Sequence, residues 1–212
     1  MTDDSLDLPA QKLVFFGTIT ASLSHELKNV LATINEFSGL LDDLTRGAAA
    51  GRSLSPERLQ SVCGKIQKQI RRGEVIIQRL NRFSHSVDEP GRQVDIKVVL
   101  GEICDLCHRF ADLKQVALER QFPQESVLVP LDSFAFQYAV YLGIDLALQA
   151  GAEARVVTVS FATTGSACDV VIASADPMDP TLAARWSTLQ QVMQHMGGEA
   201  GADGDRIVLA LH

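Results

Sequence analysis

The hexapeptide Ser24-His25-Glu26-Leu27-Lys28-Asn29 lies inside a long periodic segment, from about residue 13 to residue 44, that decides the fold. Apolar residues recur in this segment at intervals of three and four, as they do along one stripe of an amphipathic helix. The stripe consists of Phe16, Ile19, Leu23, Leu27, Val30, Ile34, Phe37, Leu41 and Leu44. His25 falls on nearly the opposite side of the helix, so we expect its imidazole to face solvent. Asn29 lies one turn further along the same face.

A second long helix is predicted from about Pro56 to Val87. The first helix, which we expect to end near Thr45, would span roughly 50 Å at 1.5 Å per residue. Ser55 and Pro56 supply a cap and a first-turn proline for the second helix. Its apolar stripe is assigned to Leu59, Val62, Ile66, Ile70, Gly73, Ile77, Leu80 and Val87. Two long helices with a short connection form an antiparallel hairpin, and two hairpins would bury their seams as a four-helix bundle, so we expect a symmetric homodimer.

The second helix carries many more basic than acidic residues. Its basic residues are Arg58, Lys65, Lys68, Arg71, Arg72, Arg79 and Arg82, against Glu57 and Glu74. A basic stripe suits a phosphorylated species or an acidic partner surface. It is equally typical of a solvated helix face that keeps a bundle soluble, and charge alone does not separate the two interpretations.

The composition is that of an ordinary globular chain. Of the 212 residues, 46% are hydrophobic and 21% are charged, and the formal net charge is -7. This acidic balance argues against nucleic acid as a partner, because nucleic-acid-binding proteins usually show a basic footprint. The first residues are acidic and no apolar run reaches the roughly 18 residues of a membrane span. We therefore expect a cytoplasmic protein that has no membrane partner.

The four cysteines are expected to be free thiols, because no export signal points to a disulfide framework. The stretch Cys104-Asp105-Leu106-Cys107-His108 matches the pattern of c-type haem attachment. However, it lies on the apolar stripe of a predicted helix, in which Leu100, Ile103 and Phe110 also take part. Core cysteines explain the pattern better than a haem or a redox dithiol.

The stretch Glu89-Pro90-Gly91-Arg92 marks a boundary between two predicted domains, residues 1–89 and 90–212. The second domain alternates helices with short runs of β-branched residues. Helices are expected at about 97–113, 132–150 and 181–196, and strands at about 116–119, 127–129, 156–162, 168–174 and 206–211. This order predicts an α+β protein, with a helical hairpin followed by an α/β sandwich whose helices lie on one face of a mixed sheet.

The segment from Ser24 to Ile34 resembles the H-box of two-component sensor histidine kinases, which lies in their dimerisation and phosphotransfer helix. In that family the histidine accepts a phosphoryl group, the acidic neighbour orients it or takes its proton, and the residue four positions on assists dephosphorylation of a partner. The resemblance therefore implies these roles for His25, Glu26 and Asn29.

The second domain resembles the ATP-binding domain of the same kinases, with departures at the nucleotide site. The helix from Asp132 to Ala150 is similar to the one that carries two asparagines four residues apart in kinases, the second of which binds magnesium. Tyr141 and Asp145 occupy the matching positions. Tyrosine cannot replace an amide, whereas an aspartate remains a possible magnesium ligand.

Further departures concern the glycines that kinases use to approach the nucleotide. Asp176, the expected adenine contact, is retained, but Pro177 and Pro180 follow it where glycines are typical. Arg185 and Trp186 stand in place of a glycine-rich phosphate loop. These departures imply that the fold is retained and the ATP site is lost.

The resemblance thus implies a histidine phosphotransferase of the ChpT or sporulation-relay type, which passes a phosphoryl group between His25 and an aspartate of response-regulator receiver domains. We expect no cofactor and no metal site of its own, since the receiver would supply Mg²⁺. Lys28 and Arg72 are candidates to screen phosphate charge. The alternatives are a receiver phosphatase that uses Asn29, a kinase with an atypical ATP site, and a non-enzymatic dimeric adaptor.

Overall fold

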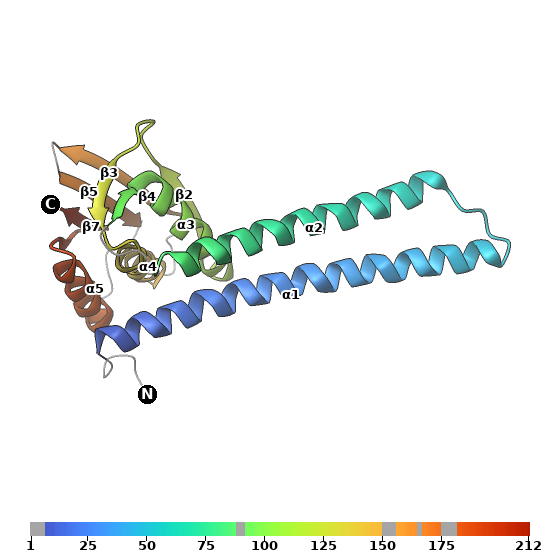
Figure 1. Ribbon diagram of the computed structural model, residues 1–212, viewed down its shortest axis with the longest axis horizontal. Helices are drawn as coiled ribbons and strands as arrows, with labels where there is room; N and C mark the ends of the chain where they lie inside the picture. The colour runs from blue at the N-terminus through green and yellow to red at the C-terminus, as the bar shows by residue number, and fades with distance from the viewer. Residues whose placement is uncertain (1–6, 88–91, 150–155, 165–166, 175–181) are drawn as a thin grey trace. The chain divides into compact units, whose positions relative to one another are not determined.

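The computed structural model describes residues 7–87, 92–149, 156–164, 167–174 and 182–212. Its internal contacts divide the chain into two units, which are described separately (Figure 1). One unit is the greater part of a helical hairpin, residues 18–82. The other combines residues 1–17 with residues 83–212. The predicted boundary at residues 89 and 90 lies outside the described residues.

The hairpin is built from α1, Leu8–Ala49, and α2, Pro56–His85. The first helix extends beyond its predicted end near Thr45 because the residue that terminates it is Gly51, at a φ of 83°. The amide of Arg52 closes this end by donating to the carbonyl of Gly47 at 3.0 Å. Ser55 caps α2 by accepting a hydrogen bond from the amide of Arg58 at 3.3 Å. Both predicted helices are confirmed.

The two helices of the hairpin approach each other at Gly73. A β-carbon at this position would lie 3.4 Å from Val30 and 3.7 Å from Leu27, so α2 turns its glycine toward α1. Ile76 is only 3% exposed, whereas Ile70 and Ile77 are 47% and 46% exposed. The face that α2 turns toward α1 passes through residues 69, 73 and 76. Ile70 and Ile77, two members of the predicted stripe, lie beside that face, where a second hairpin would have to cover them.

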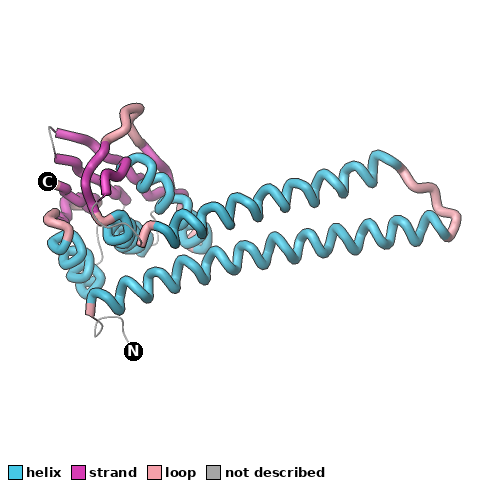
Figure 2. Tube along the Cα trace, in the orientation of Figure 1, coloured by secondary structure: helices cyan, strands magenta, loops and turns pink. Residues whose placement is uncertain are grey.

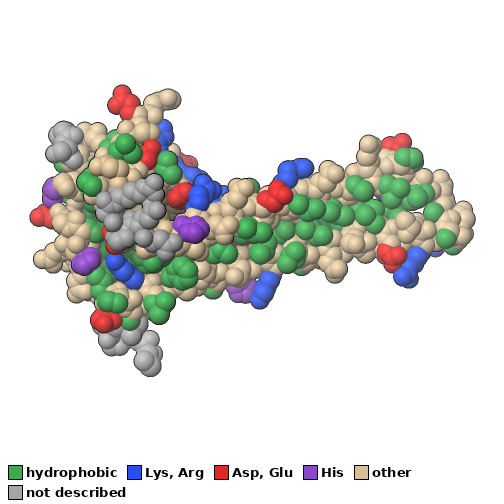
Figure 3. Space-filling model, viewed as in Figure 1, with side chains coloured by type: hydrophobic (Ala, Val, Ile, Leu, Met, Phe, Trp, Pro, Cys, Tyr) green, Lys and Arg blue, Asp and Glu red, His purple; other side chains and the backbone are tan. Residues whose placement is uncertain are grey.

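The hairpin keeps large apolar side chains exposed along its length. They are Leu31, Ile70, Val75 and Ile77. Figure 3 shows hydrophobic side chains gathered along the two helices on the face in view. The homodimer that would cover such residues stays a prediction. No helix among the described residues combines the length and apolar character that crossing a membrane requires.

The second unit contains a five-stranded sheet in the order β2-β4-β5-β7-β6. Strands β2 and β4 are parallel and the other neighbours are antiparallel, so the predicted mixed sheet is confirmed. A separate antiparallel pair joins β1 and β3. The strands are β1 Arg92–Asp95, β2 Ala117–Gln121, β3 Leu128–Leu131, β4 Val156–Thr164, β5 Ala167–Ser174, β6 Glu199–Asp203 and β7 Arg206–Leu211.

Three helices cover one face of this sheet (Figure 2). They are α3 Ile96–Leu113, α4 Ser133–Gln149 and α5 Ala183–His195. Along β5 the side chains alternate between fully and half buried, as expected for a strand with helices on one side only. Gly143 of α4 lies so close to β5 that an added β-carbon would collide with the side chain of Ile172. The α+β fold class is thus confirmed.

Two strands were missing from the sequence-based prediction. β1 lies directly before the helix that was expected from about residue 97. Asp95 at its end caps α3 by accepting from the amide of Lys97 at 2.9 Å. β6 follows the turn at Gly197 and Gly198 and was not expected at all. The core cysteines were predicted correctly, because Cys104 and Cys107 are each 1% exposed on α3.

Candidate functional site

His25 lies on the exposed face of α1, opposite the buried Ile19, Leu23 and Val30. Asn29, one turn along the helix, is exposed on the same face. The helix places the two residues together because four positions turn it through about 400°. The imidazole and the amide are therefore both open to a partner that approaches the hairpin.

The residues that border His25 on its own helix face leave room for a docking protein. Ala21 and Ala32, one turn before and two turns after it, are exposed and small. Lys28 is exposed three positions on and adds a cation to the same surface. This surface therefore combines an exposed imidazole ring with a positive charge and small neighbouring side chains.

Glu26 is half-buried and follows His25 directly. Adjacent helical positions project about 100° apart and do not face each other. Among the residues that the structure describes, no hydrogen bond or ion pair engages the side chains of His25, Glu26 or Lys28. The helix therefore brings His25 and Asn29 together on one face, whereas Glu26 lies at the border of that face.

Arg72 comes from α2 and is exposed. Its neighbour Gly73 faces Leu27 and Val30, so Arg72 lies at the level of α1 where the hexapeptide ends. Among the described residues, no hydrogen bond or ion pair holds it in place. Arg72 and Lys28 are therefore cations at one level of the hairpin, and neither is fixed against His25.

The helix that resembles the nucleotide-binding helix of kinases is α4, and Tyr141 on it belongs to an aromatic cluster. The Tyr141 ring lies 4.9 Å from that of Phe15 and 5.9 Å from that of Phe110, between centroids. Phe15 also stacks on Tyr138 at 5.0 Å and meets Phe83 edge-on at 5.5 Å. The position that carries an amide in kinases is thus filled by a packed ring.

Asp145, the candidate magnesium ligand, is held by two other side chains. Arg185 of α5 forms an ion pair with its Oδ2, and Gln149 donates to the same oxygen at 2.8 Å. The exposed fractions of the Asp145 and Arg185 side chains are 18% and 44%. The cation that balances this carboxylate therefore comes from the protein itself.

Lys114 adds a further positive charge to this end of α4. Its ammonium donates to the carbonyl of Leu148 at 3.2 Å. Partial burial, and secondly the nearby Arg185, lower the pKa of Lys114 from its ordinary value. Arg185 and Lys114 therefore leave no excess of negative charge at this end of α4 to attract magnesium.

These residues do not fit a magnesium–nucleotide complex. Magnesium needs oxygen ligands, and Asp145 is occupied by Arg185 while Tyr141 is packed between phenylalanines. The predicted features at Asp176, Pro177 and Pro180 lie outside the described residues. Among the described residues of α4, Tyr141 is packed against other rings and the charge of Asp145 is balanced by Arg185.

In the sequence alone, Arg185 stands out only as a replacement for a glycine. The pair could have been identified from its charges. Arg185 lies in the first turn of one helix and Asp145 at the expected metal position of another, so the arginine can take the place of a metal cation. The aromatic cluster was also missed, because Phe16 instead of Phe15 was assigned to the buried stripe. Phe15 is 2% exposed, while Phe16 is half-buried.

The chain matches no protein-family model. Over 120 residues it is 28% identical to Sporulation kinase D of Bacillus subtilis, and this match covers 57% of the chain and 22% of that kinase. The chain therefore spans about a fifth of the length of this curated relative.

Solved structures similar to the chain include histidine kinases. The Acinetobacter baumannii histidine kinase AdeS gives a TM-score of 0.47 at 12% identity, over 82% of this chain and 92% of that one. The catalytic domain of histidine kinase ThkA gives 0.49 at 10% identity, over 57% and 94%. The mycobacterial sensor histidine kinase MprB gives 0.47 at 17% identity, over 57% and 96%.

The sequence similarity to a sporulation kinase, together with the H-box-like stretch on α1, relates the chain to the two-component histidine kinases.

Proposed function

We propose that the chain is a histidine phosphotransferase that exchanges a phosphoryl group between His25 and the aspartate of a receiver domain, and that it does not phosphorylate itself from ATP. The observation that carries this proposal is the contrast between two helices. His25 on α1 is exposed and open, while Asp145 and Tyr141 on α4 are committed to Arg185 and to the aromatic cluster.

The exchange requires a neutral imidazole whose ring nitrogen attacks the phosphorus in line with the bond that breaks. The P–N bond forms on His25 as the P–O bond to the receiver aspartate breaks, and that aspartate leaves as a carboxylate. The reverse step regenerates the free imidazole. Both directions use the same atoms, so the relay needs no further reactant.

Glu26 would act on the second ring nitrogen of His25. In the undocked structure no hydrogen bond joins the two, as described above, so the carboxylate must turn along the helix surface when a receiver docks. There it would accept a hydrogen bond from the ring N–H, fix the tautomer and stabilise the positive charge of the phosphorylated ring. Glu26 is therefore proposed to orient the nucleophile.

The charges around the transferred phosphoryl group would come from both proteins. Lys28 and Arg72 are exposed cations at one level of the hairpin, and long basic side chains can reach an incoming phosphate. The receiver would bring the Mg²⁺ ion that balances the phosphoryl oxygens. Our proposal accordingly assigns no metal ligand to this chain.

The experiment is transfer of label from a phosphorylated receiver and, separately, from ATP. We expect acid-labile label on the chain from the receiver and none from ATP. His25→Gln should abolish the label. The matched control is His108→Gln, because His108 is also exposed on a helix and lies 3.2 Å from the carboxylate of Asp112. This variant should be labelled as well as the unmodified chain.

Two outcomes would overturn the proposal. One is label from ATP, or micromolar affinity for a non-hydrolysable ATP analogue by calorimetry, which would indicate a kinase. The other is unchanged signalling by His25→Gln, which would indicate an adaptor.

A receiver phosphatase is the second candidate, since the exposed Asn29 lies one turn from His25 and could position a water molecule. In that case Asn29→Ala would abolish release of inorganic phosphate from the receiver, while His25→Ala would retain it. A relay gives the opposite pattern, because transfer fails in His25→Ala and continues in Asn29→Ala.

A further inference from the structure

Strand β6 forms one edge of the five-stranded sheet, and the described residues place no strand beyond it. It pairs with β7 through a tight turn at Gly204, with Asp203 opposite Arg206 and Gly201 opposite Val208. In such a hairpin these pairs exchange hydrogen bonds with each other, so the residues between them turn their backbone groups outward. Those residues are Ala200 and Ala202.

The edge of β6 lacks several of the features that usually protect an exposed strand. Exposed edge strands are commonly blocked by lysine, proline or a bulge. β6 instead has small side chains at Ala200, Gly201 and Ala202, and its register with β7 is continuous. No hydrogen bond among the described residues engages the outward amides of Ala200 and Ala202. Another strand can therefore approach this edge closely.

The start of β6 is fixed by two glycines. Gly197 has a φ of 75°, which ends α5, and the amide of Gly198 donates to the carbonyl of Met193 at 2.9 Å. A β-carbon on Gly198 would lie 2.5 Å from the carbonyl oxygen of Ala210 on β7. The first residues of β6 are therefore packed closely against β7, and the outer edge is open from Ala200 onward.

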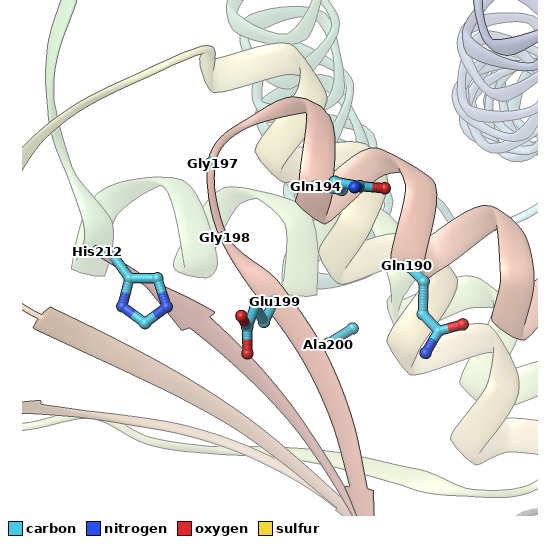
Figure 4. A pocket seen from close by; sticks show the side chains of 7 residues that line it. All are labelled: Gln190, Gln194, Gly197, Gly198, Glu199, Ala200 and His212. Carbon is cyan, nitrogen blue, oxygen red and sulfur yellow. The ribbon is translucent and has the colours of Figure 1, made fainter.

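An open groove of about 600 Å³ lies at this end of β6. Figure 4 shows Gln190 projecting from α5 on the side of β6 where Ala200 points, and Glu199 and His212 on the other side. Gln194 and the two glycines complete the lining. Amide oxygens and a carboxylate accept hydrogen bonds from a cationic side chain, so the groove suits lysine or arginine.

We propose that β6 binds an extended, basic peptide segment of a partner protein, which adds a strand to the sheet. The backbone of the segment would pair with the outward groups of Ala200 and Ala202. One lysine or arginine would enter the groove beside Glu199, and a second would lie near Asp203 at the other end of the strand. This inference concerns the sandwich alone and does not depend on phosphotransfer at His25.

The charges on β6 favour a basic segment over a second copy of the chain. In an antiparallel pair of two β6 strands centred on Gly201, Glu199 would lie opposite the second copy's Asp203, and the same would occur at the other end. Like charges directly opposite each other destabilise strand pairing. A segment with lysine or arginine at these positions converts both repulsions into attractions.

The test uses the full chain and a fluorescent nine-residue peptide of alternating valine and threonine. Lysines replace its third and seventh residues, so that they are four positions apart, as Glu199 and Asp203 are. We expect saturable binding by fluorescence anisotropy and slower hydrogen exchange at the amides of Ala200 and Ala202. The same peptide with glutamate in place of both lysines should bind at least about tenfold more weakly, because it meets two carboxylates.

The variant Ala200→Pro/Ala202→Pro removes only outward donors, so β6 can still pair with β7. It should weaken binding of the lysine peptide about tenfold, as expected from the loss of two hydrogen bonds. The control, Ala200→Ser/Ala202→Ser, keeps both amides and should bind normally. A second variant, Glu199→Lys/Asp203→Lys, should reverse the preference between the two peptides and does not depend on how β6 tolerates proline.

Three results would overturn the proposal. The first is no binding of the lysine peptide at millimolar concentration. The second is protection of amides elsewhere, for instance on β2 at the opposite edge. The third is a change in the sedimentation of the chain alone in the proline variant, since this would make a second copy the occupant of β6. Failure of phosphotransfer to His25 would leave peptide binding, hydrogen exchange and sedimentation unaffected, so the two proposals can fail separately.

Discussion

Arg185 on α5 forms an ion pair with Asp145 on α4, at the position where a nucleotide-binding relative would hold magnesium. The carboxylate also accepts from Gln149 at 2.8 Å, so it is engaged on the protein side. The pair joins two helices that the sequence separates by two strands. It therefore contributes to the packing of the sandwich and balances the charge of the carboxylate.

A double-mutant cycle with Asp145→Asn and Arg185→Met should reveal the strength of this pair. We expect a coupling free energy of about 1 kcal/mol from urea unfolding, since the carboxylate is largely buried but the guanidinium is partly screened. The matched control is Asp42 with Arg46 on α1, whose side chains are 56% and 77% exposed. Their coupling should stay below about 0.5 kcal/mol, and equal couplings would contradict a specific role for the Asp145 pair.

Phe15 should be the most sensitive position at the start of α1. It is 2% exposed and contacts the rings of Phe83, Phe134, Tyr138 and Tyr141. Phe15→Ala should lower the free energy of unfolding by about 3–5 kcal/mol, because it leaves a cavity among these rings.

The control for Phe15 is Leu13→Ala on the same helix. Leu13 is 70% exposed, and its loss should change the free energy of unfolding by less than about 0.5 kcal/mol. Fluorescence of Trp186, the only tryptophan, reports unfolding of the same unit. A small effect at Phe15 would mean that α1 begins independently of the sandwich.

The long helices were predictable because their apolar residues repeat locally every three or four positions. The exposure of His25 follows from the same period. The strands β1 and β6 were not predictable in this way, since Arg-Gln-Val-Asp and Glu-Ala-Gly-Ala-Asp have little β-branched or aromatic content. They become strands by pairing with β3 and β7, which the local sequence does not reveal.

The same distinction explains which parts of the candidate site were found. His25 and Asn29 share a face of one helix, and that is a local property. Asp145 and Arg185 meet only because α4 packs beside α5, and Phe15 is buried only because α1 begins against α4. At the start of α1, the buried residue is therefore Phe15, which packs on α4, and not Phe16, which the predicted stripe contains.

The four thiols should differ sharply in reactivity. Cys63 is exposed, whereas Cys104, Cys107 and Cys168 are buried. Iodoacetamide at pH 8 should modify Cys63 alone in the folded chain and all four thiols in urea, as counted by mass spectrometry. The variant Cys63→Ser should take up no label when folded. Rapid labelling of Cys104 or Cys107 without urea would indicate that α3 opens from the sheet.

Stability should fall at alkaline pH through the buried thiols. Burial raises the pKa of Cys104 from 9.0 to about 12, the nearby Arg120 partly opposing this effect. Above about pH 9 the unfolded thiol loses its proton while the folded one keeps it, so the free energy of the unfolded state falls relative to that of the folded state. This contribution is fully present below pH 9 and is lost as the pH rises toward 12.

The measurement is urea unfolding at pH 8.5 and pH 10.5. Cys104→Ala should show a smaller decrease between these values than the unmodified chain, whereas Cys63→Ala should show the same decrease. Identical pH dependence in Cys104→Ala would show that other groups cause the loss.

Two glycines at and near the start of β6 should respond differently to substitution. A β-carbon at Gly198 would lie 2.5 Å from the Ala210 carbonyl oxygen and 3.0 Å from Met193, while one at Gly201 would meet nothing within 4 Å. Gly198→Ala should therefore cost about 1–3 kcal/mol of unfolding free energy, because the backbone of β7 must move. Gly201→Ala should be nearly neutral, and an equal cost at both positions would contradict this geometry.

The aromatic cluster also constrains the order in which the chain can mature during synthesis. Phe15 leaves the ribosome long before Phe134 and Tyr138, its eventual neighbours in space. Its ring must wait in water until α4 has been translated. The N-terminal end of α1 therefore cannot complete its packing before α4 is made. A fragment that stops before α4 would expose the Phe15 ring, an apolar surface that chaperones can bind.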